Sequence, residues 1–348
     1  TSNSSATASW EAIDPGVFDT AYYEVAIGTT PGGTETLFWM NIGNVLSYQV
    51  QDGVDGASLS LSPGIDYFYS VRAVNSTGGV SNVATTTPWQ LFDFATQLTD
   101  IVLDLDATVL SSVLDNTATA ADQGGFNGSL DQWLDLSTST VTHQVYSIGG
   151  TRPVFDSLNN EVEFDGANTM LQIDNSDEIN LQTLAEKNIT VAFSTSSDTT
   201  TRQVIYEEGG NARGMNIYID NNKVYCGFWN VPDDGDGSQD FIAVSSPVVP
   251  NTDYVVSWDF DYSNFTGADG LDGSLNCFVN TELAGSSNTT TRVYPHGGAI
   301  GIGGSNGNSY YHTGSDGGDH HFEGPIRRVL INNQALRLDI IQQLHNNI

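Results

Sequence analysis

Residues 61–78 read LSPGIDYFYSVRAVNSTG, and this stretch decides the fold of the first part of the chain. A Pro-Gly turn at positions 63–64 leads into a long strand-like run, and Gly78 supplies the next turn. Upstream, further short strand-like runs are separated by Gly and Pro, which is typical of an all-β sandwich. These runs are SATASWEAI, AYYEVAIG, ETLFWMNIG, SYQVQ and SLSL.

The spacing of this stretch resembles the E–F corner and F strand of fibronectin type III domains. The matching pattern is Leu61-x-Pro63-Gly64-x-x-Tyr67-x-x-x-Val71-x-Ala73-x-Asn75-x-x-Gly78. The resemblance implies that the Tyr67 hydroxyl returns to the backbone and that Trp10 lies in the core. Too few residues precede Trp10 for a complete first strand. Either the chain is part of a longer multidomain protein, or that strand is degenerate.

A break in composition at Thr85-Thr86-Thr87-Pro88 ends this region. We therefore predict a fibronectin type III-like domain at 1–88, a linker at 89–95 and a larger domain at 96–348. The larger domain again shows short alternating strands, with a tight hairpin turn at Asn221-Asn222. One helix is predicted at 335–345 from its apolar face.

The larger region resembles bacterial concanavalin A-like or laminin G-like jelly rolls. The resemblance rests on LDLDA at 103–107, WLDLS at 133–137, Arg152-Pro153, VEFDG at 162–166 and the segment 322–336. It implies a second β-sandwich, so the fold class expected for the whole chain is all-β. Members of this class bind glycans, adhere to proteins or accompany polysaccharide-degrading enzymes, so the fold alone does not determine the function.

The charge of the chain excludes several partners. The sequence has 42 acidic and 10 basic residues, a net charge of -32. Such a chain repels phosphates and anionic lipid headgroups, so we expect neither nucleic-acid binding nor membrane insertion. No run of 18 apolar residues supplies a membrane span.

The two cysteines, Cys226 and Cys277, both fall in strand-like runs. A disulfide between them and a pair of buried free thiols are both compatible with the sequence, because spacing cannot establish the distance a bridge needs.

Acidic loops in the larger domain are candidates for calcium, which prefers six to eight oxygen ligands. One loop is DDGDGSQD at 233–240, and a second acidic region spans 259–273. The predicted ligands are Asp234, Asp236, Ser238, Asp240, Asp259, Asp261, Asp269 and Asp272. Solvated acidic loops without an ion are the alternative.

Aromatic and amide side chains near strand ends and in a Gly/Ser/Asn-rich loop are suited to binding a sugar. The predicted ligand-binding residues are Trp229, Asn306, Asn308, Tyr310 and Tyr311. All five are also compatible with ordinary loop packing.

Catalysis is the weaker hypothesis. Some jelly-roll enzymes hydrolyse glycans with two glutamates on one strand, spaced Glu-x-Asp-x-Glu. Glu161-x-Glu163-x-Asp165 has this spacing but a different order. We therefore expect no enzymatic activity.

These observations predict a non-catalytic protein of the extracellular space or cell surface, acting in adhesion or polysaccharide recognition and stabilised by calcium. Its expected partner is a glycan or a cell-surface or matrix protein. One alternative is a carbohydrate-binding accessory region of a larger secreted glycan-degrading enzyme. The other is a structural subunit of a surface filament or layer.

Overall fold

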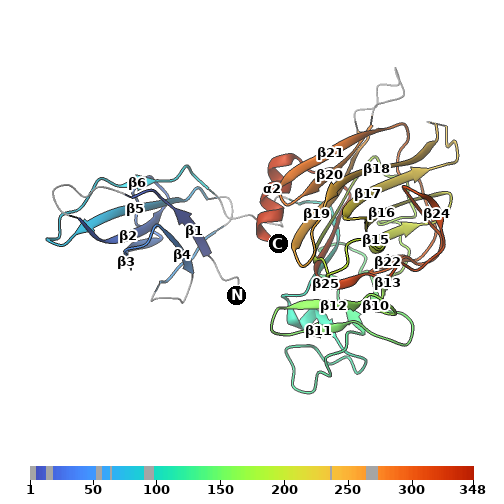
Figure 1. Ribbon diagram of the computed structural model, residues 1–348, viewed down its shortest axis with the longest axis horizontal. Coiled ribbons are helices and arrows are strands. Elements are labelled where there is room, and N and C mark those ends of the chain that lie inside the picture. The colour runs from blue at the N-terminus through green and yellow to red at the C-terminus, as the bar shows by residue number, and fades with distance from the viewer. Residues whose placement is uncertain are drawn as a thin grey trace. The chain divides into compact units, whose positions relative to one another are not determined.

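A computed structural model describes residues 5–12, 19–51, 57–62, 65–89, 98–235, 237–263 and 273–348. The chain divides into two compact units, Thr1–Gln97 and Leu98–Ile348 (Figure 1). Nearly all regular structure is antiparallel β, which confirms the predicted all-β class. Among the described residues, no helix combines the length and apolar character needed to cross a membrane.

The N-terminal unit contains two sheets of antiparallel strands. One pairs β1 (Ser5–Ser9) with β4 (Ser47–Gln51). The other has the order β3 (Leu37–Gly43), β2 (Thr20–Gly28), β5 (Phe68–Asn75) and β6 (Ala84–Thr85). Alternate residues of β2 and β5 face one core, because successive side chains of a strand point to opposite sides.

Tyr67 packs in this core, and its hydroxyl accepts a hydrogen bond of 2.8 Å from the Ser62 backbone N–H. The predicted return of this hydroxyl to the backbone is confirmed. Trp10 lies just after β1 and packs on the same core against Tyr23, with ring centroids 5.7 Å apart. Pro63 and Gly64 of the motif lie outside the described residues.

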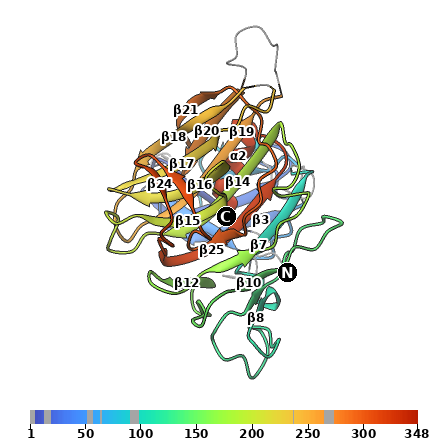
Figure 2. The same ribbon diagram turned by 90° about the vertical axis from the view of Figure 1, so that its right-hand side faces the viewer.

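The C-terminal unit is a sandwich of two large sheets whose inner faces share one core (Figure 1, Figure 2). The nine-stranded sheet has this order: β18 (Gln239–Pro247), β17 (Lys223–Asn230), β16 (Arg213–Asp220), β15 (Gln203–Gly209), β22 (Ile300–Ile302), β13 (Leu171–Ile173), β10 (Val145–Ser147), β9 (Gln132–Trp133) and β8 (Val113–Leu114).

The eight-stranded sheet has this order: β11 (Val154–Asp156), β12 (Glu161–Asp165), β25 (Glu323–Asn332), β14 (Glu186–Ser194), β19 (Asp253–Asp261), β20 (Gly273–Val279) and β21 (Glu282–Thr289), with β7 (Ile101–Asp106) also paired to β25. A short 3-10 helix spans Leu110–Ser112.

Two local predictions for this unit are confirmed. Asn221 and Asn222 form the turn between β16 and β17 with φ of 50° and 61°, a left-handed conformation that asparagine tolerates. The predicted C-terminal helix exists as α2 (Leu338–Asn347). It begins three residues later than expected, because Arg337, with φ of -65° and ψ of 149°, is still extended. The preceding Ala335 and Leu336 N–H groups donate to Glu186 and Asp259.

A hairpin of β23 (Ser309–Tyr311) and β24 (Gly314–Asp316) covers part of the outer face of the nine-stranded sheet (Figure 2). Its backbone accepts a 2.7 Å hydrogen bond at Tyr310 O from Asn216 of β16. We call the segment 303–321, which contains this hairpin, the strap.

A buried ion pair joins the two sheets. Lys187 of β14 and Glu208 of β15 are both fully buried and in direct contact. The Lys187 ammonium also donates to Ile179 O at 2.8 Å, and the Tyr206 hydroxyl donates to Glu208 at 3.0 Å. Burial opposes ionisation of Glu208, but Lys187 and His296 together outweigh it and lower the pKa of Glu208.

Cys226 of β17 and Cys277 of β20 also face each other across the core, with their Sγ atoms 2.6 Å apart. Both are buried and unbridged in the structure. A disulfide between them, which would link the two sheets, stays a prediction.

The ion pair generates the first testable prediction. Lys187→Met leaves the Glu208 charge buried without its ammonium partner, which costs about 3–5 kcal/mol of unfolding free energy. Adding Glu208→Leu removes that charge and recovers most of the loss. Lys223→Met, at an exposed lysine, is the matched control. Urea unfolding of the four proteins measures the effect, and equal stability of Lys187→Met and the control would contradict it.

Candidate functional site

A row of residues crosses the outer face of the nine-stranded sheet. Directly paired residues of neighbouring strands share a face, and their sequence neighbours, such as Trp133 and Ile302, point into the core. The row is Gln132, Tyr146, Gln172, Gly301, Glu207, Asn216 and Gly227. We call it the outer-face row. Gln132 is exposed, Tyr146 and Gln172 are half-buried, and Gly301, Glu207 and Asn216 lie under the strap.

The open half of the row is held by a chain of hydrogen bonds. The Tyr146 hydroxyl donates to Asp174 at 2.9 Å and accepts from the Gln172 amide at 2.6 Å. The Gln172 carbonyl in turn accepts from the Asn306 amide at 2.8 Å. Burial and the Asp174 carboxylate raise the pKa of Tyr146, so the hydroxyl keeps its proton at neutral pH. These hydrogen bonds fix the positions of four neutral or acidic side chains, so that hydrogen-bond donors and acceptors lie next to each other.

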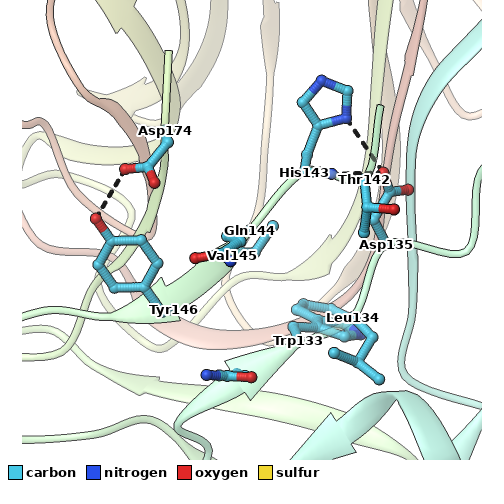
Figure 3. Close-up of a pocket in the computed structure, with 10 residues that line it drawn as sticks. Trp133, Leu134, Asp135, Thr142, His143, Gln144, Val145, Tyr146 and Asp174 are labelled. Atoms are coloured by element: carbon cyan, nitrogen blue, oxygen red, sulfur yellow. Dashed lines mark hydrogen bonds and ion pairs between the residues drawn. The ribbon is translucent and has the colours of Figure 1, made fainter. Parts of the chain in front are cut away.

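A first cavity of about 350 Å³ opens at one end of this chain (Figure 3). Tyr146 and Asp174 line one side, the segment 144–145 lies in the middle, and Trp133, Leu134 and the segment 142–143 line the other side (Figure 3). The wall therefore combines an aromatic ring, apolar surface and hydrogen-bonding groups, which is the usual composition of a small-molecule site.

An Asp-His-Ser arrangement stands beside the first cavity. His143 contacts Asp135 at 3.2 Å through Nδ1 (Figure 3) and the Ser176 hydroxyl at 3.0 Å through Nε2. Ser176 is outside the cavity lining, and its hydroxyl oxygen also accepts the Ile179 N–H at 3.2 Å. The Ser176 N–H donates to Asn180, so it cannot stabilise an oxyanion. The arrangement therefore fastens two loops together and does not place a nucleophile at the cavity.

A second cavity, of about 310 Å³, opens at the other end of the chain. It is lined by Asn306 and Ser305 of the strap, by Met170 and His321, and by the backbone of Gly149 and Gly150. Asp319 lines it as well, with an exposed carboxylate. The first cavity, lined by Tyr146, and the second, lined by Asn306, are thus joined through Gln172.

Glu207 occupies the covered half of the row. It is only 1% exposed, and neither carboxylate oxygen has a hydrogen-bond partner of good geometry among the described residues. Burial raises its pKa to about 8, against the lowering effect of the nearby Asn306 N–H and Ser309 hydroxyl. Glu207 is therefore largely protonated at neutral pH, as expected for a carboxyl in a site without a cation.

The predicted sugar-binding residues do not share one surface in the structure. Trp229 is fully buried, donates to Gly210 O at 2.7 Å and packs against Tyr310. Tyr311 is also buried, beneath the Arg202 guanidinium. Asn308 is exposed, while Asn306 lines the second cavity. Of the five, only Asn306 joins the open half of the outer-face row.

The predicted calcium ligands do not gather at one place within the described part of the chain. Asp234 is paired with Arg213. Asp259 is buried, accepts from Asn188 and Leu336, and has a pKa raised to about 6 by burial. Asp261 closes a local turn by accepting from Ser263.

Ser238 contributes its carbonyl to Thr290, and Asp240 is exposed. Asp236, Asp269 and Asp272 lie outside the described residues. Calcium binding at the predicted loops stays a prediction.

Three other carboxylates do gather. Oxygen atoms of Asp156, Glu161 and Glu163 lie within 4.8 Å of one another on β11 and β12. Burial, followed by the charges of Glu161 and Asp156, raises the pKa of Glu163. Asp165, the third acid of the spacing considered for catalysis, instead accepts three backbone N–H groups of its own turn.

Sequence reasoning missed Gln132, Tyr146, Gln172 and Asp174. Their strands are two or three residues long and are brought together from distant parts of the chain. The available signal was the alternation in QW and VYS, which marks Gln132 and Tyr146 as pointing away from the core.

Comparisons with known proteins report on the fold. No protein-family model matches the sequence, and no curated protein matches it. The botulinum neurotoxin serotype D ligand binding domain, in complex with N-acetylneuraminic acid, is similar over 73% of this chain and 52% of its own, with 11% identity and a TM-score of 0.50. The botulinum neurotoxin type G receptor binding domain is similar over 72% and 51%, with 10% identity and a TM-score of 0.46. The chain spans about half the length of these structures, and the likeness concerns architecture alone.

The raised pKa of Glu207 generates a pH-dependent prediction. The folded protein holds a proton at Glu207 up to about pH 8, whereas the unfolded chain releases it near the ordinary value of 4.5, so the wild type loses stability as the pH rises between these values. Glu207→Gln is neutral at every pH. We expect its stability relative to wild type to improve by about 2–5 kcal/mol between pH 5 and pH 9.

Denaturant unfolding at both pH values measures this change, with Glu282→Gln, at an exposed glutamate of β21, as the control. The same stability difference at pH 5 and pH 9 would show that Glu207 ionises normally.

The acidic cluster generates a second prediction at this point. With a chelator present, Glu163→Gln is expected to raise the melting temperature at about pH 7.5, because it removes the repulsion of Glu163 by Glu161 and Asp156. A calcium ion held by the three carboxylates reverses the order, since the substitution then removes a ligand. Melting curves with chelator and with calcium measure both effects, and Asp240→Asn is the control. A less stable variant in chelator would contradict the repulsion.

Proposed function

We propose that this protein is a non-catalytic carbohydrate-recognition protein of the extracellular space or cell surface, acting in adhesion or polysaccharide recognition. The observation that carries the proposal is the open half of the outer-face row. There, Asp174, Tyr146, Gln172 and Asn306 form one hydrogen-bonded chain between two cavities.

The chemistry of this surface suits a sugar. Each sugar hydroxyl both donates and accepts, and amide, phenol and carboxylate groups placed side by side meet both needs. The half-buried Tyr146 ring adds apolar surface against which the C–H face of a sugar can pack. The side chains are already oriented by one another, so binding costs little additional ordering.

Two further observations support a binding role. Ser176, the hydroxyl of the Asp-His-Ser arrangement, is outside the cavity lining. The serotype D neurotoxin domain, which shares the architecture, is a ligand binding domain in complex with a sugar. At 11% identity this likeness supports only the capacity of such a sandwich to present a glycan site.

The site generates a binding prediction. Tyr146→Ala removes the ring and the central hydroxyl, and it is expected to weaken binding of the recognised glycan at least tenfold. Tyr146→Phe keeps the ring and loses only the hydrogen bonds, so an intermediate loss is expected. Screening the full chain on a glycan array, followed by calorimetry with the best probe, measures these effects.

Tyr22→Ala, at a half-buried tyrosine of the N-terminal unit, is the matched control and should bind as the wild type does. Melting curves establish that each variant is folded. The absence of any bound glycan at the highest soluble concentration of wild type would overturn the proposed function.

A further inference from the structure

We propose that the outer-face row takes an uncharged oligosaccharide chain that reaches from the first cavity to the second, and that it discriminates against glycans carrying carboxylate groups. This inference rests on the proposed function and adds to it the class and the length of the ligand.

The length follows from the positions of the two cavities. The linings of the two cavities together reach from Gln144 in the first to Gly149 in the second, five residues along the chain. At the rise of an extended strand this combined extent is at most about 17 Å, which exceeds the size of a single sugar ring. Tyr146 lines the first cavity and is joined through Gln172 to Asn306, which lines the second. A ligand that contacts the whole hydrogen-bonded chain is therefore an extended one.

The charge class follows from the side chains that line the cavities. Neither lining contains a lysine or an arginine, and each contains an exposed acid, Asp174 in the first and Asp319 in the second. Arg152 adjoins the second cavity in sequence, but its guanidinium is paired with Asp131 at 2.6 Å. A carboxylate on the ligand would thus meet like charge at both ends without a lysine or arginine of the lining to pair with it.

The overall charge of the protein also disfavours acidic ligands. A net charge of -32 disfavours the approach of any anion. Neutral hydroxyls, by contrast, can donate to Asp174 and Asp319 and accept from the amides of Gln172 and Asn306. Attraction of the neutral ligand and repulsion of the acidic one arise from the same side chains.

Calorimetry with the full chain tests both parts of the inference. The probes are disaccharides and hexasaccharides of β-glucan, α-glucan, galactan, mannan and chitin. Hexasaccharides of polygalacturonate and polymannuronate, and 3′-sialyllactose against lactose, are the acidic counterparts. We expect at least one neutral hexasaccharide to bind, its disaccharide to bind at least tenfold more weakly, and each acidic counterpart to bind at least tenfold more weakly than its neutral form.

The outcomes separate this inference from the proposed function. An acidic probe that binds as tightly as its neutral counterpart, or a disaccharide that binds as tightly as its hexasaccharide, overturns the inference while carbohydrate recognition stands. Absence of binding to every probe overturns both.

Variants test whether Asp174 and Asp319 cause the discrimination between neutral and acidic glycans. Asp174→Asn/Asp319→Asn is expected to reduce the discrimination between neutral and acidic hexasaccharides at least threefold, whatever it does to the affinity for each. Glu282→Gln, an exposed acid of the eight-stranded sheet, should leave that ratio unchanged. Because the repulsion is between exposed charges, added salt should also reduce the ratio in wild type. A ratio unaffected by both the double substitution and salt overturns the assignment.

Discussion

The ion pair between Lys187 and Glu208 is the constraint on which the rest of the C-terminal unit depends. It is fully buried between the two sheets, so β14 and β15 must face each other with these residues in register. Because successive side chains of a strand point to opposite sides, an inward Glu208 requires an outward Glu207. Two adjacent glutamates thereby acquire opposite properties. Lys187 and His296 lower the pKa of Glu208, whereas burial raises the pKa of Glu207 to about 8.

The same ion pair helps to position the first cavity. Lys187 donates to Ile179 O, and the turn that contains Ile179 is also held by Ser176, which bonds to His143. Asp174, a wall of the first cavity, immediately precedes this turn. The Asp-His-Ser arrangement and the buried lysine therefore hold the same loop, and both help to keep the wall of the first cavity rigid.

The sequence allowed prediction of features that depend on neighbouring residues. Alternation located the strands, two asparagines located a left-handed turn, and Tyr67 was assigned its backbone contact from one short motif. The outer-face row was not predictable in this way, because Tyr146, Gln172 and Gly301 become neighbours only through the register of distant strands. Trp229 illustrates the same limit. Its position near a strand end suggested a sugar-binding ring. In the structure the ring is fully buried and packs against Tyr310 of the strap, which comes much later in the sequence.

Glycine determines how much of the row is open. A Cβ at Gly301 would collide with the Gly304 carbonyl, and one at Gly227 would collide with Asn216 and Phe241. The absence of a side chain at Gly301 lets the strap lie directly on the sheet, where Glu207 and Asn216 are buried. On the other side of Gly301, Asn306 of the strap donates to Gln172, and Tyr146 and Gln132 stay accessible. The boundary of the proposed binding face is thus a property of the backbone, whereas its proposed selectivity is a property of the side chains, and proteins that share an architecture can differ in the second without the first.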